Sequence, residues 1–343
     1  MFKAMYRRGA RLTVAAALLF VAVGCDVIGG SDGAEGPERF PVKIDGLWGF
    51  INPEGRIAIS PQYEAVGPFS DGMAAVQVGV DWGYVDRSGV MTISPQFRAA
   101  GVFSEGLAAV RGVDFGAPYG YVNKSGEIAI PSAYDLALPF AEGRAPVRVA
   151  GQWGYVNREG GMAIAATYSD AQEFSEGLAA VEGPDGWIYI DLNGAVVIDP
   201  SFAINVATPF SEGRAAFATN EGWGYLNRSG TPVISPQYQE AAPFSEGRAA
   251  VRDGAFGYIN ARGDLVIEPQ FAGAGRFSEG LAPVRFNSAW TFVDIASGRV
   301  VMNKTFNQAS PFSSGIAQIT GGGDNPQIGY IDRGGEYVWY PQR

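Results

Sequence analysis

The chain has 343 residues, with 25 basic and 35 acidic side chains, one cysteine and no histidine. The absence of histidine removes the commonest general base and the commonest transition-metal ligand, and a single cysteine excludes an intramolecular disulfide. A net charge of −10 argues against a nucleic-acid partner, because phosphates require a basic surface. We therefore expect a globular protein that needs no cofactor and no metal.

Residues 1–24 combine a basic start with an apolar run from Leu12 to Val23, as a secretory signal peptide does. This run is shorter than the ~20 residues of a bilayer-spanning helix. Small Gly24 directly precedes Cys25, so we expect cleavage after Gly24. The string Ala22-Val23-Gly24-Cys25 resembles the lipobox of bacterial lipoproteins, which implies lipidation of Cys25. An ordinary export signal followed by an incidental cysteine is the alternative.

Residues 25–39 are rich in Gly, Ser, Asp and Glu without apolar periodicity, which predicts a flexible tether. Removal of residues 1–24, which hold four basic and no acidic side chains, leaves 21 basic against 35 acidic residues, a net charge of −14. Anionic headgroups would repel such a surface, so we expect the lipid to attach the protein to the membrane. The expected location is the bacterial cell envelope, in a leaflet that the sequence does not specify.

Residues 40–343 contain one aromatic strand pattern nine times, at intervals of 33–38 residues. The repeated string is typically Trp-Gly-Tyr-Val, and its first position holds Trp48, Trp82, Tyr119, Trp153, Trp187, Trp223, Phe256, Trp290 and Ile328. A repeat of this length is typical of solenoids and propellers. We therefore interpret residues 40–343 as one domain of nine units.

The apolar runs in each unit predict three antiparallel strands, as in residues 74–78, 82–86 and 91–94. An Asx residue followed three places later by glycine predicts the turn between the second and third strands, with the glycine in a left-handed conformation. These glycines are Gly55, Gly89, Gly126, Gly160, Gly194, Gly230, Gly263 and Gly335, and Gly298 follows Asp294 with one residue more. Calcium loops are the alternative, although one Asx per turn supplies few oxygens for that ion.

Two aromatic side chains follow the third strand in nearly every unit, for example Phe97 and Phe103, and we expect both to fill the core. A platform for a cofactor or a sugar is the alternative. Seven units also carry an acid before a glycine, namely Asp71, Glu105, Glu142, Glu176, Glu212, Glu246 and Glu279. We expect each carboxylate to close its own turn by accepting hydrogen bonds from nearby N–H groups, rather than to bind metal or catalyse.

The predicted fold is therefore all-β, a tandem array of nine three-stranded antiparallel meanders. Complete meanders at both ends of the repeat region favour an open superhelical array, because propellers often close by splitting one blade between the chain ends. A closed, propeller-like ring is the alternative. Prolines in Phe40-Pro41 and Pro341-Gln342-Arg343 would protect exposed sheet edges in an open array.

The strings Trp-Gly-Tyr-Val-Asn-Arg-Ser-Gly, Ile-Ser-Pro-Gln-Tyr and Phe-Ser-Glu-Gly-Leu-Ala resemble the WG-repeat family of bacterial proteins over residues 40–340. The resemblance implies a β-rich scaffold, usually in exported or envelope proteins, and no catalytic residues. Ile188 and Thr291 replace the glycine of the motif, and residues 302–305 lose the proline. We expect those units to pack less tightly.

Two functions remain open on this basis. The first is a lipid-anchored, non-catalytic scaffold that binds a protein or an envelope polymer. The second is a carboxylate-based enzyme acting on glycans, or a carbohydrate-binding protein. The insertions at residues 112–118 and 321–327 break the repeat and are either functional loops or tolerated surface variation.

Overall fold

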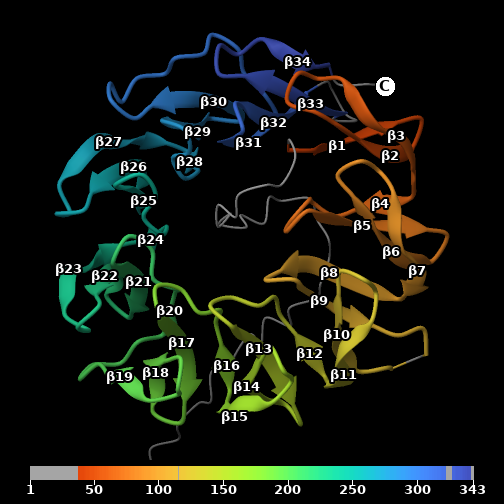
Figure 1. Ribbon diagram of the computed structural model, residues 1–343. Coiled ribbons are helices and arrows are strands. Elements are labelled where there is room, and N and C mark those ends of the chain that lie inside the picture. Colours follow the sequence, from red (N-terminus) through yellow and green to blue (C-terminus); the bar gives the residue numbers. More distant parts are fainter. Residues whose placement is uncertain (1–37, 115, 322–326, 341–343) are drawn as a thin grey trace, which may run out of the picture.

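The computed structural model describes residues 38–114, 116–321 and 327–340. These residues form nine small antiparallel sheets, of which seven have four strands and two have three. Figure 1 shows the sheets arranged radially in a closed ring, with the last sheet beside the first. The molecule is therefore a nine-bladed β-propeller. Within the described ranges, no helix is long and apolar enough to cross a membrane.

The strands follow the chain from blade to blade without crossovers. Blades 1 to 3 contain β1 (Phe40–Ile44), β2 (Leu47–Ile51), β3 (Ile57–Tyr63); β4 (Ala65–Val66), β5 (Met73–Val78), β6 (Asp81–Asp86), β7 (Met91–Phe97); β8 (Ala99–Ser104), β9 (Leu107–Arg111), β10 (Tyr119–Asn123) and β11 (Ile128–Tyr134). Blades 4 to 6 contain β12 (Leu136–Ala137), β13 (Arg144–Val149), β14 (Gln152–Asn157), β15 (Met162–Tyr168); β16 (Asp170–Ala171), β17 (Leu178–Gly183), β18 (Gly186–Asp191), β19 (Val196–Ile198); β20 (Val206–Ala207), β21 (Arg214–Thr219), β22 (Gly222–Asn227) and β23 (Pro232–Tyr238). Blades 7 to 9 contain β24 (Glu240–Ala241), β25 (Arg248–Asp253), β26 (Ala255–Asn260), β27 (Leu265–Phe271); β28 (Gly273–Ala274), β29 (Leu281–Phe286), β30 (Ala289–Asp294); β31 (Gln308–Ser313), β32 (Ile316–Gly321), β33 (Gln327–Asp332) and β34 (Tyr337–Trp339).

The all-β repeat fold is confirmed, and the closed ring is the arrangement found, so our preference for an open array is corrected. The predicted meander corresponds to the second, third and fourth strands of a blade. The link that we assigned to a loop contains a short additional strand, such as β4, which lies nearest the ring axis (Figure 1). Sequence analysis missed this strand because it is only two residues long in most blades.

Each core lies between two neighbouring blades rather than within one. Tyr84 of blade 2, for example, is buried with Phe103 of blade 3, and the two rings meet edge to face at 4.8 Å. The Tyr84 hydroxyl donates a hydrogen bond of 2.9 Å to the carbonyl of Gly101 in blade 3. The same pairing of ring and hydroxyl recurs for Tyr121, Tyr155, Tyr189, Tyr225 and Tyr258.

The ring closes between blades 9 and 1, where the usual first strand is absent from the described part of blade 1. The Tyr330 hydroxyl instead donates a 2.8 Å hydrogen bond to the carbonyl of Pro41 on β1. Phe40 occupies a position at which blade 2 has Ala74, and its ring meets Tyr330 edge to face at 5.6 Å. Phe40 and Pro41 thus take part in closing the ring rather than only protecting a free edge.

Candidate functional site

The residues singled out from the sequence lie mainly in three places on each blade. These are the start of the third strand, the Asx–Gly turn and the turn between the first two strands. The tryptophans begin the third strand, and most of them are half-buried, while Trp187 is buried. The turn glycines Gly55, Gly89, Gly126, Gly160, Gly194, Gly230 and Gly263 all have φ between 77° and 88°. Gly24 and Cys25 lie outside the described residues, as do the signal segment, most of the tether, residues 341–343 and part of each insertion.

The motif glycine after tryptophan has a steric role. A Cβ at Gly83 would lie 2.4 Å from the Ile93 carbonyl oxygen and 2.8 Å from the Pro95 nitrogen. Both atoms belong to β7, whose register shifts at this point so that the outer strand bulges over the glycine. A side chain at this position therefore cannot coexist with the regular outer strand.

The seven acids lie in two-residue turns between the first two strands of a blade. Asp71 has φ 52° and Gly72 has φ 79°, and the flanking Ser70 and Met73 exchange two backbone hydrogen bonds. Positive φ at both central residues defines a type I′ turn. We call the face of the ring that carries these turns, together with the Asx–Gly turns, the clamp face.

The carboxylates on the clamp face hold the next blade and not their own turn, which corrects the sequence expectation. Both oxygens of Glu105 accept a hydrogen bond from the Gly143 N–H, at 3.2 and 3.0 Å. The corresponding acceptor–donor pairs are Asp71–Gly106, Glu142–Gly177, Glu176–Gly213, Glu212–Gly247, Glu246–Gly280 and Glu279–Gly315. The left-handed conformation of the acid directs its side chain across the junction to the neighbouring blade.

Each of these seven junctions also carries one basic side chain, supplied from one of two positions. When Met or Leu follows the acid–glycine pair, the Asx turn of the next blade contributes the cation, as Lys124 does to Asp71 at 2.6 Å and Arg228 to Glu176 at 3.7 Å. Arg158 and Arg333 take the same place beside Glu105 and Glu279. When arginine follows the acid–glycine pair, the residue after the Asx in the next blade's turn is apolar.

The second arrangement occurs at Arg144, Arg214 and Arg248, opposite Leu192, Ala261 and Ile295 respectively. Arg144 Nε donates to the Leu192 carbonyl at 3.1 Å, so this guanidinium crosses the junction from the other side. Arg214 likewise lies over the Phe244 ring of blade 7, at 5.4 Å from its centre. The repeated acids are therefore structural groups that bind the next blade, and a hollow of about 420 Å³ among Asp71, Glu105, Lys124 and Arg158 belongs to this network.

Glu173 is an acid that sequence analysis missed. It precedes Phe174 at a position that holds proline in five other units, Pro68, Pro139, Pro209, Pro243 and Pro311. Glu173 is an exposed residue, but nearby protein atoms partly desolvate its carboxyl and raise its pKa. The sequence signal for this residue was that glutamate replaces the proline of the other units. Within the described part of the chain, no group of three or more Asp, Glu, His or Cys side chains is placed to hold a metal ion.

Blade 5 breaks the outer-strand pattern, and a pocket lies at the break. Its residues 196–202 align with the regular β27 of blade 7, including Pro200 and Phe202 in the positions of Pro269 and Phe271. Nevertheless β19 ends at Ile198. The cause is Ile188, because a Cβ at the matching Gly257 would lie 2.5 Å from the Ile267 carbonyl oxygen of β27. The isoleucine side chain therefore needs space that the backbone of a regular outer strand takes.

Blade 8 confirms this explanation with a different side chain. Thr291 replaces the glycine, and its hydroxyl donates a 3.1 Å hydrogen bond to the Met302 carbonyl, which lies where the outer strand passes. Isolated bridges from Trp290 to Phe306 and from Val293 to Val300 keep the outer segment nearby, although it forms no continuous strand. Isoleucine offers no such bond, so the blade 5 segment leaves the sheet after Ile198.

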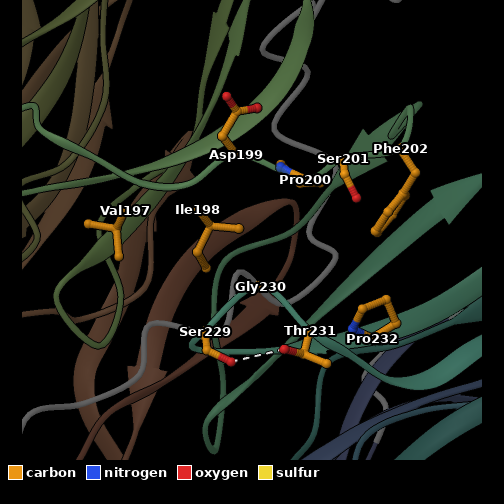
Figure 2. A pocket seen from close by; sticks show the side chains of 10 residues that line it. All are labelled: Val197, Ile198, Asp199, Pro200, Ser201, Phe202, Ser229, Gly230, Thr231 and Pro232. Atoms are coloured by element: carbon orange, nitrogen blue, oxygen red, sulfur yellow. Dashed lines mark hydrogen bonds between the residues drawn. The ribbon is translucent and has the colours of Figure 1, made fainter.

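The pocket at this break has a volume of about 380 Å³ and lies between the outer parts of blades 5 and 6. We call it the rim pocket, and it is lined by Val197, Ile198, Asp199, Pro200, Ser201, Phe202, Ser229, Gly230, Thr231 and Pro232. Figure 2 shows Phe202 and Pro232 on one side, Val197 and Ile198 on the other, and Ser229 with Thr231 between them. The two hydroxyls lie 3.1 Å apart.

Comparison with known proteins identifies the repeat. The family described as "WG containing repeat" matches residues 48–79, 82–111, 119–153, 153–182, 187–222, 223–254 and 256–290. No curated protein matches the sequence significantly.

Among solved structures, a eukaryotic initiation factor matches with a TM-score of 0.64 and 12% identity, covering 90% of this chain and 96% of that one. The dihydro-heme d1 dehydrogenase NirN matches with a TM-score of 0.46 and 11% identity, covering 88% and 72%. At such identities the first likeness shows the fold alone.

Proposed function

Since this chain belongs to the WG containing repeat family, we propose that it is a lipid-anchored scaffold of the bacterial cell envelope that binds a protein or an envelope polymer without catalysis. One observation carries the proposal: the repeated acids, tyrosines and glycines are engaged in holding blades together. Glu105, for example, binds Gly143, and Tyr121 binds Leu138. The repeated chemistry thus builds a large rigid surface, which suits binding.

The anchor is supported by the lipobox-like string ending in Cys25 and by the tether that follows it. Residues 26–39 separate Cys25 from Phe40, where β1 begins, and a fully extended chain of that length reaches roughly 45 Å. Metabolic labelling with a fatty acid should modify the full chain and not the Cys25→Ser variant. Equal labelling of both chains would remove the anchor from the proposal.

Binding is tested with the folded, unlipidated Cys25→Ser chain as bait against detergent extracts of envelopes. We expect one protein or polymer to be enriched over a bait made from an unrelated propeller. Enrichment of the same material by both baits, or of none by the folded bait, would contradict the scaffold function.

One observation favours the second candidate, a protein that acts on glycans or binds them. Glu173 has a raised carboxyl pKa, as a general acid requires, although no partner carboxylate is assigned to it among the described residues. Purified protein incubated with envelope glycans should release reducing ends if this function holds, and Glu173→Gln should abolish the release. Activity that survives Glu173→Gln would exclude this residue as the acid.

A further inference from the structure

We propose that the rim pocket binds a short stretch of neutral glycan, with Phe202 and Pro232 as the surface on which a sugar ring lies. The proposal refines the envelope-polymer part of the proposed function and rests on it. It assigns a site where blade 5 departs from the ring's repeated pattern, next to the Asx–Gly turn of blade 6.

The composition of the pocket wall defines the ligand class. Its polar side chains are the hydroxyls of Ser201, Ser229 and Thr231 and the carboxylate of Asp199. None of the lining residues is basic, so a phosphate or carboxylate ligand would meet no opposite charge in the wall. Hydroxyls and a carboxylate suit a ligand that is itself rich in hydroxyl groups.

The apolar part of the wall fits the same class. Phe202 is half-buried against Phe217, with the ring centres 5.5 Å apart, so its outward face and the exposed ring of Pro232 are the flat surfaces open to the C–H face of a sugar. Exposed Val197 and buried Ile198 lie opposite (Figure 2). A volume of about 380 Å³ lies at the lower end of small-molecule sites, roughly 300–1,000 Å³. The pocket is open at the rim, so a longer chain can pass through it without threading.

The sequence provides a switch for the site. Ile188 displaces the outer segment, and residues 199–202 otherwise carry the regular Pro and Phe positions of an outer strand. In Ile188→Gly, we expect residues 199–202 to return to the sheet, which places Phe202 beside Trp187 as Phe271 lies beside Phe256. The rim pocket then closes while the rest of the propeller is retained.

The experiment measures binding of soluble tetrasaccharides of glucose, mannose and N-acetylglucosamine to the folded Cys25→Ser chain by calorimetry. We expect at least one to bind, and Phe202→Ala or Thr231→Val to weaken that binding about tenfold, as loss of ring stacking or one hydroxyl contact does. Ile188→Gly should abolish it. Glu268→Gln changes the matching carboxylate of regular blade 7 and should leave the affinity unchanged.

The proposal is overturned if none of the three tetrasaccharides binds, or if Ile188→Gly and Thr231→Val retain the parent affinity. Thr231 is exposed, so its variant tests the site even if Phe202→Ala fails to fold. The envelope pull-down separates this result from the wider function. If the Ile188→Gly bait still retains the partner, the scaffold binds that partner outside the rim pocket. The sugar site is then decided by the calorimetry alone.

Discussion

At the scale of single residues, the glycine of each Trp-Gly motif is explained by the strand that passes over it. Its role is steric rather than conformational, because the outer-strand backbone occupies the place of a Cβ. Irregular outer strands in the interior blades follow from this one position. Ile188 and Thr291 mark the two interior blades with irregular outer strands.

The first prediction concerns Gly83→Ala. The new Cβ would lie 2.4 Å from a backbone oxygen, so we expect a loss of about 1–3 kcal/mol in the free energy of unfolding. Gly67→Ala in the same blade is the control, because its Cβ would lie 3.7 Å from Ala75, an ordinary contact. Equal stability of both variants in urea unfolding would contradict the steric role.

The second prediction concerns the seven buried tyrosines, Tyr84, Tyr121, Tyr155, Tyr189, Tyr225, Tyr258 and Tyr330. Burial raises the pKa of each hydroxyl above its ordinary value. A raised folded-state pKa gives stability that is fully present below about pH 10, the unfolded value, and is lost as the pH rises further.

Each tyrosine should contribute a loss of about 1.4 kcal/mol per pH unit above that point. Calorimetric melting between pH 8 and 11 should therefore show a steep fall in Tm that begins near pH 10. Tyr84→Phe removes one titrating group and should make the fall shallower. A Tm that stays constant to pH 11 would contradict the prediction.

At the scale of elements, the unit of stability is the junction between blades. Each junction from blade 2 to blade 9 combines a covalent link, an aromatic core and an acid that binds the next blade's glycine. The single cation at each junction comes from either the second strand or the Asx turn, and the two positions compensate for each other. Each of the seven acids thus holds the next blade, whichever of the two positions supplies the cation.

The third prediction moves a cation between these two positions. Arg228→Leu removes the basic partner of Glu176, and Leu178→Arg should restore it from the other side, as Arg144 does in blade 4. Exposed pairs of this kind contribute up to about 1 kcal/mol. Leu178 is buried, so Leu178→Arg alone should also lower Tm. We expect the double variant to lose less than the two single variants together, and additive losses would contradict the compensation.

At the scale of the whole molecule, closure depends on a seam that differs from the others. Ser314 replaces the acid in blade 9, and within the described residues blade 1 has no innermost strand. An apolar core of Phe40, Val42, Ile51, Ile316 and Tyr330, together with the Tyr330–Pro41 hydrogen bond, holds the seam without the acid clamp of the seven junctions from blade 2 to blade 9. The seam is therefore where we expect the ring to open first.

The fourth prediction tests this seam. Tyr330→Phe and Tyr155→Phe each remove one hydroxyl–carbonyl hydrogen bond, worth about 1 kcal/mol. Hydrogen exchange in β1 and β2 should accelerate in Tyr330→Phe, because among the described residues no covalent link or acid clamp supports that junction. Blades 4 and 5 should be less affected by Tyr155→Phe. Equal protection in both variants would show that the seam is as strong as the other junctions.

Much of this architecture could be predicted from local patterns. Alternation of side chains and the Asx–Gly spacing identify strands and turns, because both depend on residues close together in the chain. Such patterns led to nine β units and to the second, third and fourth strands of a regular blade. The innermost strand was missed because two residues carry too little pattern.

Closure of the ring, the direction of the seven acids and the rim pocket depend on contacts between residues far apart in sequence. Tyr330 meets Pro41 across 289 positions, and Glu105 reaches Gly143 across 38. No local periodicity records the angle between successive blades, which decides whether an array closes. Ile188 was visible as an exception in the sequence, but its consequence follows from the outer strand that must pass over it.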